Sequence, residues 1–181
     1  MSRLPPISDD QMTDEQRAVA NEITAGPRGE VRGPFIPLLH NAAATSAVQK
    51  MGEFLRFNGT LPGDLREMVI LIVARYWSAQ YEWFAHHRIA LEEGLDPSIC
   101  DAIAAGKRPE FSDEKLAKVH DFVVELHQTK QLSEATFNAV NEELGAAGIV
   151  ELTVLCGHYN TIAMVLNGFD CQVPGGEKPL G

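Results

Sequence analysis

The sequence has few cysteines and no cysteine pair spaced C-x-x-C. Its thiols are Cys100, Cys156 and Cys171, which lie far apart in a chain of 181 residues. An odd number of dispersed thiols is typical of a reducing compartment and provides no disulfide framework. We therefore expect a cytoplasmic protein. Cys156 lies in the most apolar segment, and we interpret it as a small core residue.

Positive charge is also scarce. Lysine and arginine total 15 against 25 acidic residues, the net charge is −10, and no basic run occurs. Nucleic acids and anionic membrane surfaces require clustered basic residues, so we expect neither as a partner. The N-terminus has no apolar stretch of the kind that a secretory signal needs. The most apolar segment, 148–169, is interrupted by Glu151, His158 and Asn160, and it predicts a buried helix and not a membrane span.

Strand signals are nearly absent, whereas helix caps and stops recur along the whole chain. Residues 28–37 contain two glycines and two prolines, which predict a structured loop. The helix at 62–77 is apolar almost all round, which implies burial on several sides. The predicted fold class is therefore all-α, in one domain. We expect helices at about 13–24, 45–58, 62–77, 79–93, 97–106, 112–130, 133–145 and 148–168.

The pair Glu82 and His86 is the main candidate for chemistry. Four residues apart on a helix, the two side chains share one face, and Ser78 and Ala79 leave room a turn earlier. A carboxylate next to an imidazole can handle protons near neutral pH. The alternatives are an ordinary surface pair, or a metal site that takes His158 as a third ligand.

Other polar residues are candidates for the same pocket. Glu67 follows Asp64 by three residues, so it serves either as part of a capping box or as a functional carboxylate. The apolar segment carries polar side chains that either satisfy one another in the core or line a pocket. Core packing is the default reading of the aromatic residues. Our predicted substrate-binding residues are Tyr81, His158, Tyr159 and Asn160.

Three parts of the sequence together resemble the carboxymuconolactone decarboxylase-like superfamily, which includes the alkylhydroperoxidase D proteins. These parts are the run Leu65–Ala74, the helix around Tyr81–His86, and Gly94-Leu95. The resemblance covers about residues 34–169. It implies a bundle of about eight helices and a trimer or a hexamer. Together with the rest of the sequence, this predicts three parts: an N-terminal helix and loop at 1–33, the superfamily's helical domain at 34–170, and a C-terminal tail at 171–181.

The peroxidase branch of this superfamily carries a glutamate, then C-x-x-C, then a histidine four residues later. On this chain the two ends match Glu67 and His86, but Ala79 and Glu82 occupy the cysteine positions. Neither residue can attack a peroxide or resolve a disulfide, so we do not expect a thiol peroxidase. The sequence is closer to a subgroup that lacks these cysteines.

For the true decarboxylases, the resemblance implies acid–base catalysis without a cofactor or metal. We expect decarboxylation or isomerisation of a small conjugated acid, lactone or enone, within aromatic compound catabolism. Glu67, Glu82 and His86 would be catalytic, with one carboxyl protonated near pH 7 because two carboxylates converge on one imidazole. Two alternatives are a non-catalytic small-molecule binder and an oxidoreductase with another redox group. An apolar pocket with a solvent-exposed His86 would favour the binder.

Overall fold

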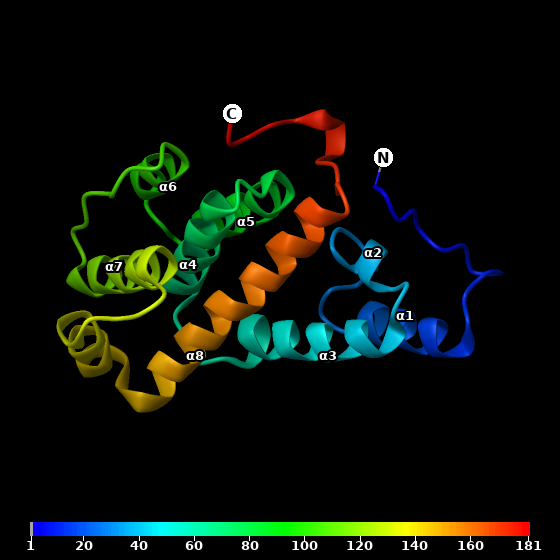
Figure 1. Ribbon diagram of the computed structural model, residues 1–181, viewed down its shortest axis with the longest axis horizontal. Helices are drawn as coiled ribbons and strands as arrows, with labels where there is room; N and C mark the ends of the chain where they lie inside the picture. The colour runs from blue at the N-terminus through cyan, green and yellow to red at the C-terminus, as the bar shows by residue number, and fades with distance from the viewer. Residues whose placement is uncertain (1) are drawn as a thin grey trace.

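The computed structural model describes residues 2–181, which form eight α-helices and no strand (Figure 1). The predicted all-α class is therefore confirmed. A π-helix, η1 (Phe54–Asn58), extends the third helix, and a 3₁₀ turn, η2 (Pro174–Gly176), follows the last. The α-helices are α1 (Asp14–Ala25), α2 (Phe35–Leu38), α3 (Ala42–Glu53), α4 (Gly63–Tyr76), α5 (Gln80–Glu92), α6 (Pro97–Ala104), α7 (Glu114–Thr129) and α8 (Glu134–Gly168).

The predicted number of helices is right because two differences cancel. The segments 133–145 and 148–168 are one helix, α8, which kinks at Gly145, where φ is 66°. The loop predicted at 28–37 contains the start of the short helix α2, with Pro34 as its N-cap and Pro37 in its first turn. Proline is tolerated there because the first backbone N–H groups of a helix have no partner within it.

The start of α3 also differs from the prediction. The helix begins at Ala42 and not at Thr45, because the Asn41 side chain accepts a hydrogen bond from the backbone N–H of Ala44 at 3.1 Å. Asparagine is a strong N-cap. The alanines that follow it show no hydrophobic periodicity, so the sequence did not predict that the helix starts this early.

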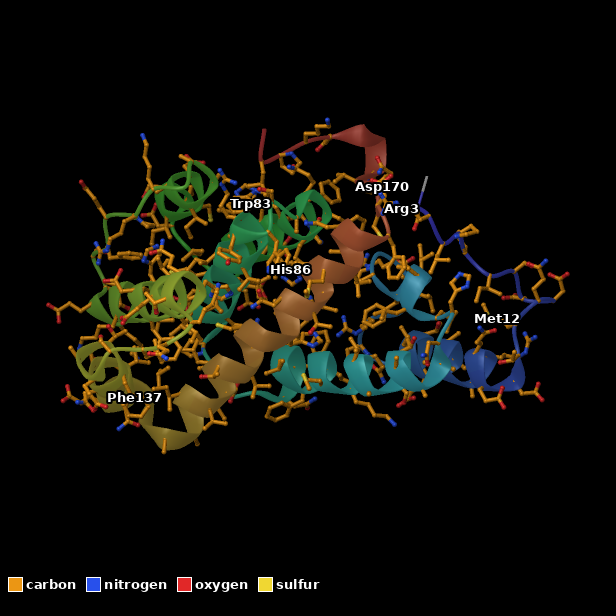
Figure 2. The ribbon with its side chains drawn as sticks, viewed as in Figure 1. Arg3, Met12, Trp83, His86, Phe137 and Asp170 are labelled. Atoms are coloured by element: carbon orange, nitrogen blue, oxygen red, sulfur yellow. The ribbon has the colours of Figure 1, made fainter. Side chains whose placement is uncertain are left out.

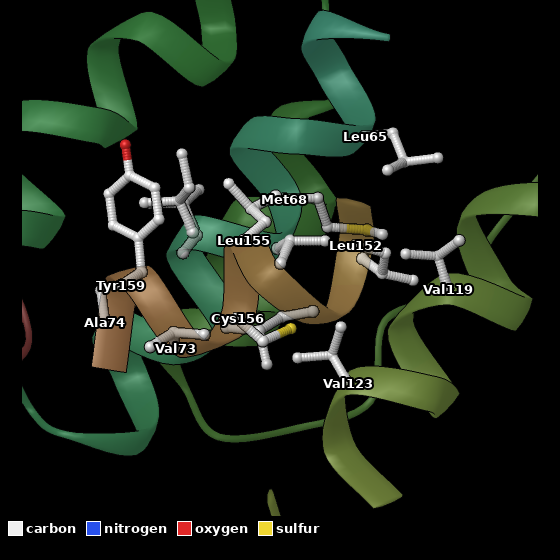
Figure 3. Packing of buried hydrophobic residues seen from close by; sticks show 14 of the residues in the cluster. Leu65, Met68, Val73, Ala74, Val119, Val123, Leu152, Leu155, Cys156 and Tyr159 are labelled. Atoms are coloured by element: carbon white, nitrogen blue, oxygen red, sulfur yellow. The ribbon is translucent and has the colours of Figure 1, made fainter. Parts of the chain in front are cut away.

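Helix α4 is the centre of the main core. Between Leu65 and Ala74 its side chains are buried almost completely, except that of Arg66, because α5, α6, α7 and α8 of the same chain surround it. The apolar character of α4 therefore needs no partner chain to explain it. Figure 3 shows this packing in residues of α4 (Leu65, Met68, Val73, Ala74), α7 (Val119, Val123) and α8 (Leu152, Leu155, Cys156, Tyr159).

Helix α8 crosses the molecule diagonally in Figure 1. Its length and composition alone would allow it to span a membrane, but more than half of its most apolar stretch is buried inside this chain. It is the core helix that the interruptions by polar residues predicted. The apolar sides of α8 pack against α4 and α7, and its polar side chains lie on the remaining positions.

A second, smaller core lies on the other side of α8 and joins α1, α2 and α3. Its buried residues are Val19 and Ile23 of α1, Phe35 of α2 and Leu39 at the end of α2, and the partly buried Ala42 of α3 packs against them. The residues between α1 and α2, together with η1, face α5 and α8 across a cleft. The walls of this cleft therefore come from two separately packed groups of side chains.

A carboxylate on α8 fixes the start of α4. Glu151 accepts hydrogen bonds from the backbone N–H of Thr60 at 2.9 Å, from its hydroxyl at 2.7 Å, and from the backbone N–H of Leu61 at 3.2 Å. A Cβ at Gly59 would lie 2.3 Å from Glu151 Oε1, so a larger residue there would displace this carboxylate from its present position. This anchor sets where α4 begins and so where Glu67 lies.

Candidate active site

Glu67 lies one turn into α4, and its side chain is fully buried. Its Oε2 is 2.6 Å from His86 Nδ1, and its Oε1 accepts a hydrogen bond from Arg66 Nε at 3.2 Å. The Asp64 carboxylate, at the helix start, accepts instead from the backbone N–H of Leu65. Glu67 therefore points toward α5, and the capping-box alternative does not describe its side chain.

Glu82 reaches the other nitrogen of the same imidazole. Its Oε1 is 3.1 Å from His86 Nε2, and the two residues are 4% and 5% exposed. His86 lies near the centre of the molecule, where α5 approaches α8 (Figure 2). A neutral imidazole has one N–H, so only the protonated ring presents a donor to both Glu67 and Glu82. The surface-pair reading of Glu82 and His86 is wrong, because both are buried.

The two carboxylates hold a proton on His86. Burial by itself would lower the pKa of His86, but the nearby Glu67 and Glu82 outweigh burial and raise it to about 9. Burial alone would raise the pKa of the Glu67 carboxyl. The positive charges of the His86 imidazole and of Arg66 outweigh burial, so this pKa is lowered. The proton that we expected on a carboxyl near pH 7 is therefore on the imidazole.

Replacing Glu67 by glutamine should lower the pKa of His86 by at least one unit. Glutamine keeps the size of the side chain but removes the negative charge of Glu67. That charge raises the pKa of His86, whereas burial lowers it. NMR titration of ¹³C-labelled histidine would measure it, with a wild-type value of about 9 expected. Glu93→Gln is the matched control, since Glu93 contacts Arg66 and not His86. An unchanged pKa in Glu67→Gln would contradict the ion-pair description.

Tyr159 and His158 of α8 complete the buried side of the site. The Tyr159 ring packs edge-on against His86 and against His158, with ring centroids 5.2 Å apart in each case. Burial raises the pKa of the Tyr159 phenol far above its usual range. Burial, together with the charges of Arg28, His86 and Arg56, lowers the pKa of His158 to about 4. Both side chains are thus neutral at pH 7.

These groups face a cleft of about 540 Å³. Tyr81 lines it, half-buried, and approaches the backbone so closely that a Cβ at Gly33 would lie 2.7 Å from its ring. Gly33 also has φ of 56°, which other residues rarely adopt. One further property of the cleft was not predicted from the sequence. Five arginines line it, although the chain is acidic: Arg28, Arg32, Arg56, Arg66 and Arg88.

Asn160 does not belong to this cleft, which corrects the sequence prediction. Its Oδ1 accepts a hydrogen bond from the Trp77 indole, and its Nδ2 donates to the Cys156 carbonyl and contacts His127 Nε2 at 2.9 Å. One residue beyond Tyr159 on a helix, a side chain points about 100° away. Asn160 therefore joins α8 to α4 and α7 on another side, where its amide is satisfied by protein groups.

The remaining candidates lie outside the acid–base cluster. His87 is half-buried and stacks on Trp83, with ring centroids 5.8 Å apart. Over residues 2–181, no three side chains of the metal-binding types come together as a site, so Glu82, His86 and His158 do not form a ready metal centre. Burial raises the pKa of Cys156 to about 12, as suits a core thiol.

Solved structures show which fold this is. An alkylhydroperoxidase AhpD core, an uncharacterized peroxidase-related protein from Ralstonia eutropha JMP134, has a TM-score of 0.77 and 19% identity, covering 94% of this chain and 91% of that one. An uncharacterized peroxidase-related protein from Silicibacter sp. TM1040 has a TM-score of 0.71 and 16% identity, covering 93% and 88%. The chain thus has the alkylhydroperoxidase D-like fold that its sequence predicted.

A third similar structure is a cysteine-to-alanine variant of the debrominase Bmp8 in complex with 2,3,4-tribromopyrrole. Its TM-score is 0.73, with 13% identity over 97% of this chain and 92% of that chain. No protein-family model matches the chain, and no curated protein is significantly similar to it. At these identities the similarity establishes the fold and leaves the chemistry to be argued from the site.

Proposed function

We propose that this protein is an enzyme of the carboxymuconolactone decarboxylase type that moves protons on a small conjugated acid, lactone or enone. The reaction is a decarboxylation or an isomerisation. The observation that carries this proposal is the buried imidazolium between two carboxylates at the wall of a cleft. These groups supply an acid and a base at neutral pH, so the proposed reaction needs no cofactor.

The contacts of the two carboxylates suggest different roles. Both oxygens of Glu67 have partners, in Arg66 and His86, so Glu67 is a positioning residue that holds the imidazole charged. Glu82 contacts His86 through Oε1, and within residues 2–181 its Oε2 has no hydrogen-bond partner. Glu82 Oε2 is therefore the oxygen free to accept a substrate proton.

In an isomerisation, Glu82 removes a proton from the carbon next to a carbonyl, and the electron pair moves to the carbonyl oxygen. His86 donates a hydrogen bond to that oxygen and stabilises the negative charge. Glu82 then returns the proton to another carbon of the conjugated system. In a decarboxylation, the electrons of the breaking C–C bond take the same route, and His86 supplies the proton that the product carbon needs.

Similar structures support a cleft for small molecules. The debrominase with this fold was solved with a bromopyrrole, a small conjugated ring. Two other similar proteins are described as peroxidase-related, so enzymes are known on this fold. An apolar pocket and an exposed His86 would have favoured the binder alternative, but the cleft is lined by charged side chains as well and His86 is buried.

The test is a panel of small unsaturated acids, lactone acids and enones incubated with the protein in D₂O and followed by ¹H NMR. We expect at least one compound to lose CO₂, shift its double bond or exchange a proton next to its carbonyl. Glu82→Gln should remove that activity while leaving the fold intact. If no panel compound reacts but some bind, the fold serves as a binder and the proposed reaction is wrong.

We predict no thiol peroxidase activity. Burial raises the pKa of Cys100 to about 11 and that of Cys156 to about 12, so neither is a thiolate at pH 7. The measurement is alkyl hydroperoxide consumption with a dithiol reductant, which should not exceed the rate without protein. A rate above that background that disappears in Cys156→Ser would contradict the prediction.

We also propose a homotrimer or a homohexamer. Apolar side chains that remain exposed on this chain support it, including Val150 at 61% and Met164 at 56% on α8, and Phe54 at 49% on η1. Light scattering should give three or six times the 19.8 kDa of one chain at micromolar protein. A mass of one chain would contradict this prediction.

A further inference from the structure

Two arginines in the cleft lack an acidic partner. The other three form ion pairs: Arg66 with Glu67 and Glu93, Arg32 with Glu30, and Arg88 with Glu92. Within residues 2–181, neither Arg28 nor Arg56 has an ion pair or a side-chain hydrogen bond. Arg3, Arg17 and Arg75 also have no ion pair, but each donates a side-chain hydrogen bond, whereas Arg28 and Arg56 do neither.

Aromatic rings hold both guanidinium groups in place. The Arg28 guanidinium carbon lies 4.7 Å from the centre of the Phe35 ring, and that of Arg56 lies 5.1 Å from the centre of the Phe57 ring. Stacking of this kind fixes the plane of the group and leaves its N–H donors unused. Arg28 Nε is buried and has no hydrogen-bond partner. A buried donor without a partner costs free energy that a bound acceptor would recover.

The two charges also act on each other. Burial lowers the pKa of Arg28, and the next largest cause is the charge of Arg56. Arg28 lies next to His158, because a Cβ built on Gly52 would be 2.7 Å from both Arg28 Nη2 and His158 Nε2. His158 contacts Tyr159, which contacts His86. The unpaired positive charge thus lies a short distance along the cleft from the acid–base groups.

We propose that Arg28 and Arg56 form a carboxylate-binding subsite, which orients the substrate so that its reacting carbon lies at Glu82 and His86. This inference rests on the proposed function and makes it more specific: the substrate is a conjugated carboxylic acid. Its carboxylate stays bound at Arg28 and Arg56 while an isomerisation, or the loss of a second carboxyl group, occurs at the other end. Guanidinium groups match a carboxylate with paired N–H donors, so a carboxylate can satisfy Arg28 and separate the two like charges.

The experiment measures binding of benzoate and of benzamide by isothermal titration calorimetry. Benzamide has the same shape without the charge, and inorganic phosphate serves as a third probe for a general anion site. The variants are Arg28→Met and Arg56→Met, and the matched control is Arg88→Met, which removes a cleft arginine that is already paired. We expect benzoate affinity to fall at least tenfold in the first two variants and less than twofold in the control. Benzamide should bind weakly and equally to all four proteins.

Each result decides the proposal. Equal benzoate binding by wild type and both methionine variants would overturn it, as would no binding of benzoate by wild type at tens of millimolar. Phosphate competing as well as benzoate would also overturn a carboxylate subsite in favour of a general anion site. Circular dichroism checks folding, and Arg28→Lys and Arg56→Lys, which keep the charge, should retain more affinity than the methionine variants. His86→Asn separates the two proposals, because it should stop turnover and leave benzoate affinity within threefold.

Discussion

Turnover should fall by about a hundredfold to ten-thousandfold when His86 is replaced by asparagine, and by a similar factor when Glu82 is replaced by glutamine. Asparagine fills much of the imidazole's space but carries no acidic proton, and glutamine cannot accept one. Loss of a general acid or base typically costs two to four orders of magnitude. The measurement is kcat on whichever panel compound reacts. The double variant should be little worse than the more damaged single variant, because the two residues act together.

A neighbouring histidine provides the control for this prediction. His87 belongs to the same helix and stacks on Trp83, without contacting either carboxylate. His87→Asn should therefore keep most of the wild-type kcat. If a folded His86→Asn protein retained more than a tenth of the wild-type rate, His86 would have no catalytic role. Additive losses in the double variant would show instead that Glu82 and His86 act independently.

The stability of the fold should decrease as pH rises from 7 to 10. The folded-state pKa of His86 is raised from 6.5 to about 9. Its ion pair therefore contributes fully below pH 6.5, and the contribution is lost as pH rises through about 9. A shift of this size corresponds to a loss of about 2 to 3 kcal/mol in the free energy of unfolding between pH 7 and pH 10. Urea unfolding at several pH values would measure it.

The His86→Asn variant isolates this effect from the other groups that titrate at high pH. Its free energy of unfolding should vary less with pH, and the difference between the two proteins should shrink as pH approaches 10. Glu67 has the opposite pH dependence. Its pKa is lowered in the folded state, so its contribution to stability is present above its unfolded-state pKa and is lost as pH falls through its folded-state pKa. Parallel curves for wild type and His86→Asn from pH 7 to pH 10 would contradict a raised His86 pKa.

Local spacing was sufficient to predict part of the site. Glu82 and His86 are four residues apart, so any helix places them together, and the structure adds that they are buried. Spacing left Glu67 as either a capping residue or a functional carboxylate. Only the resemblance paired it with His86, because 19 positions and a turn between two helices separate the two residues. No local pattern could have predicted that contact.

Other parts of the site depend on the whole fold. Arg28 and Arg56 come from different segments, and both line the cleft only in the folded chain, where α1 packs against α3 and α3 contacts α8. Asn160 was predicted from its polarity in an apolar helix, but polarity does not tell which side of α8 faces the cleft. In the fold itself, glycine at 145 was expected to end a helix, and it produces a kink instead.

The cleft lies between two cores, and this arrangement bears on how the protein selects a molecule by length. Phe35, which stacks under Arg28, is part of the small core, whereas Tyr159, which packs on His86, is part of the main core. The span between Arg28, at the proposed carboxylate-binding end, and His86, at the proposed reacting end, therefore depends on how the two cores fit together. Repacking Val19 or Ile23 would change that span, and so the preferred chain length of the acid, without altering any group that touches it.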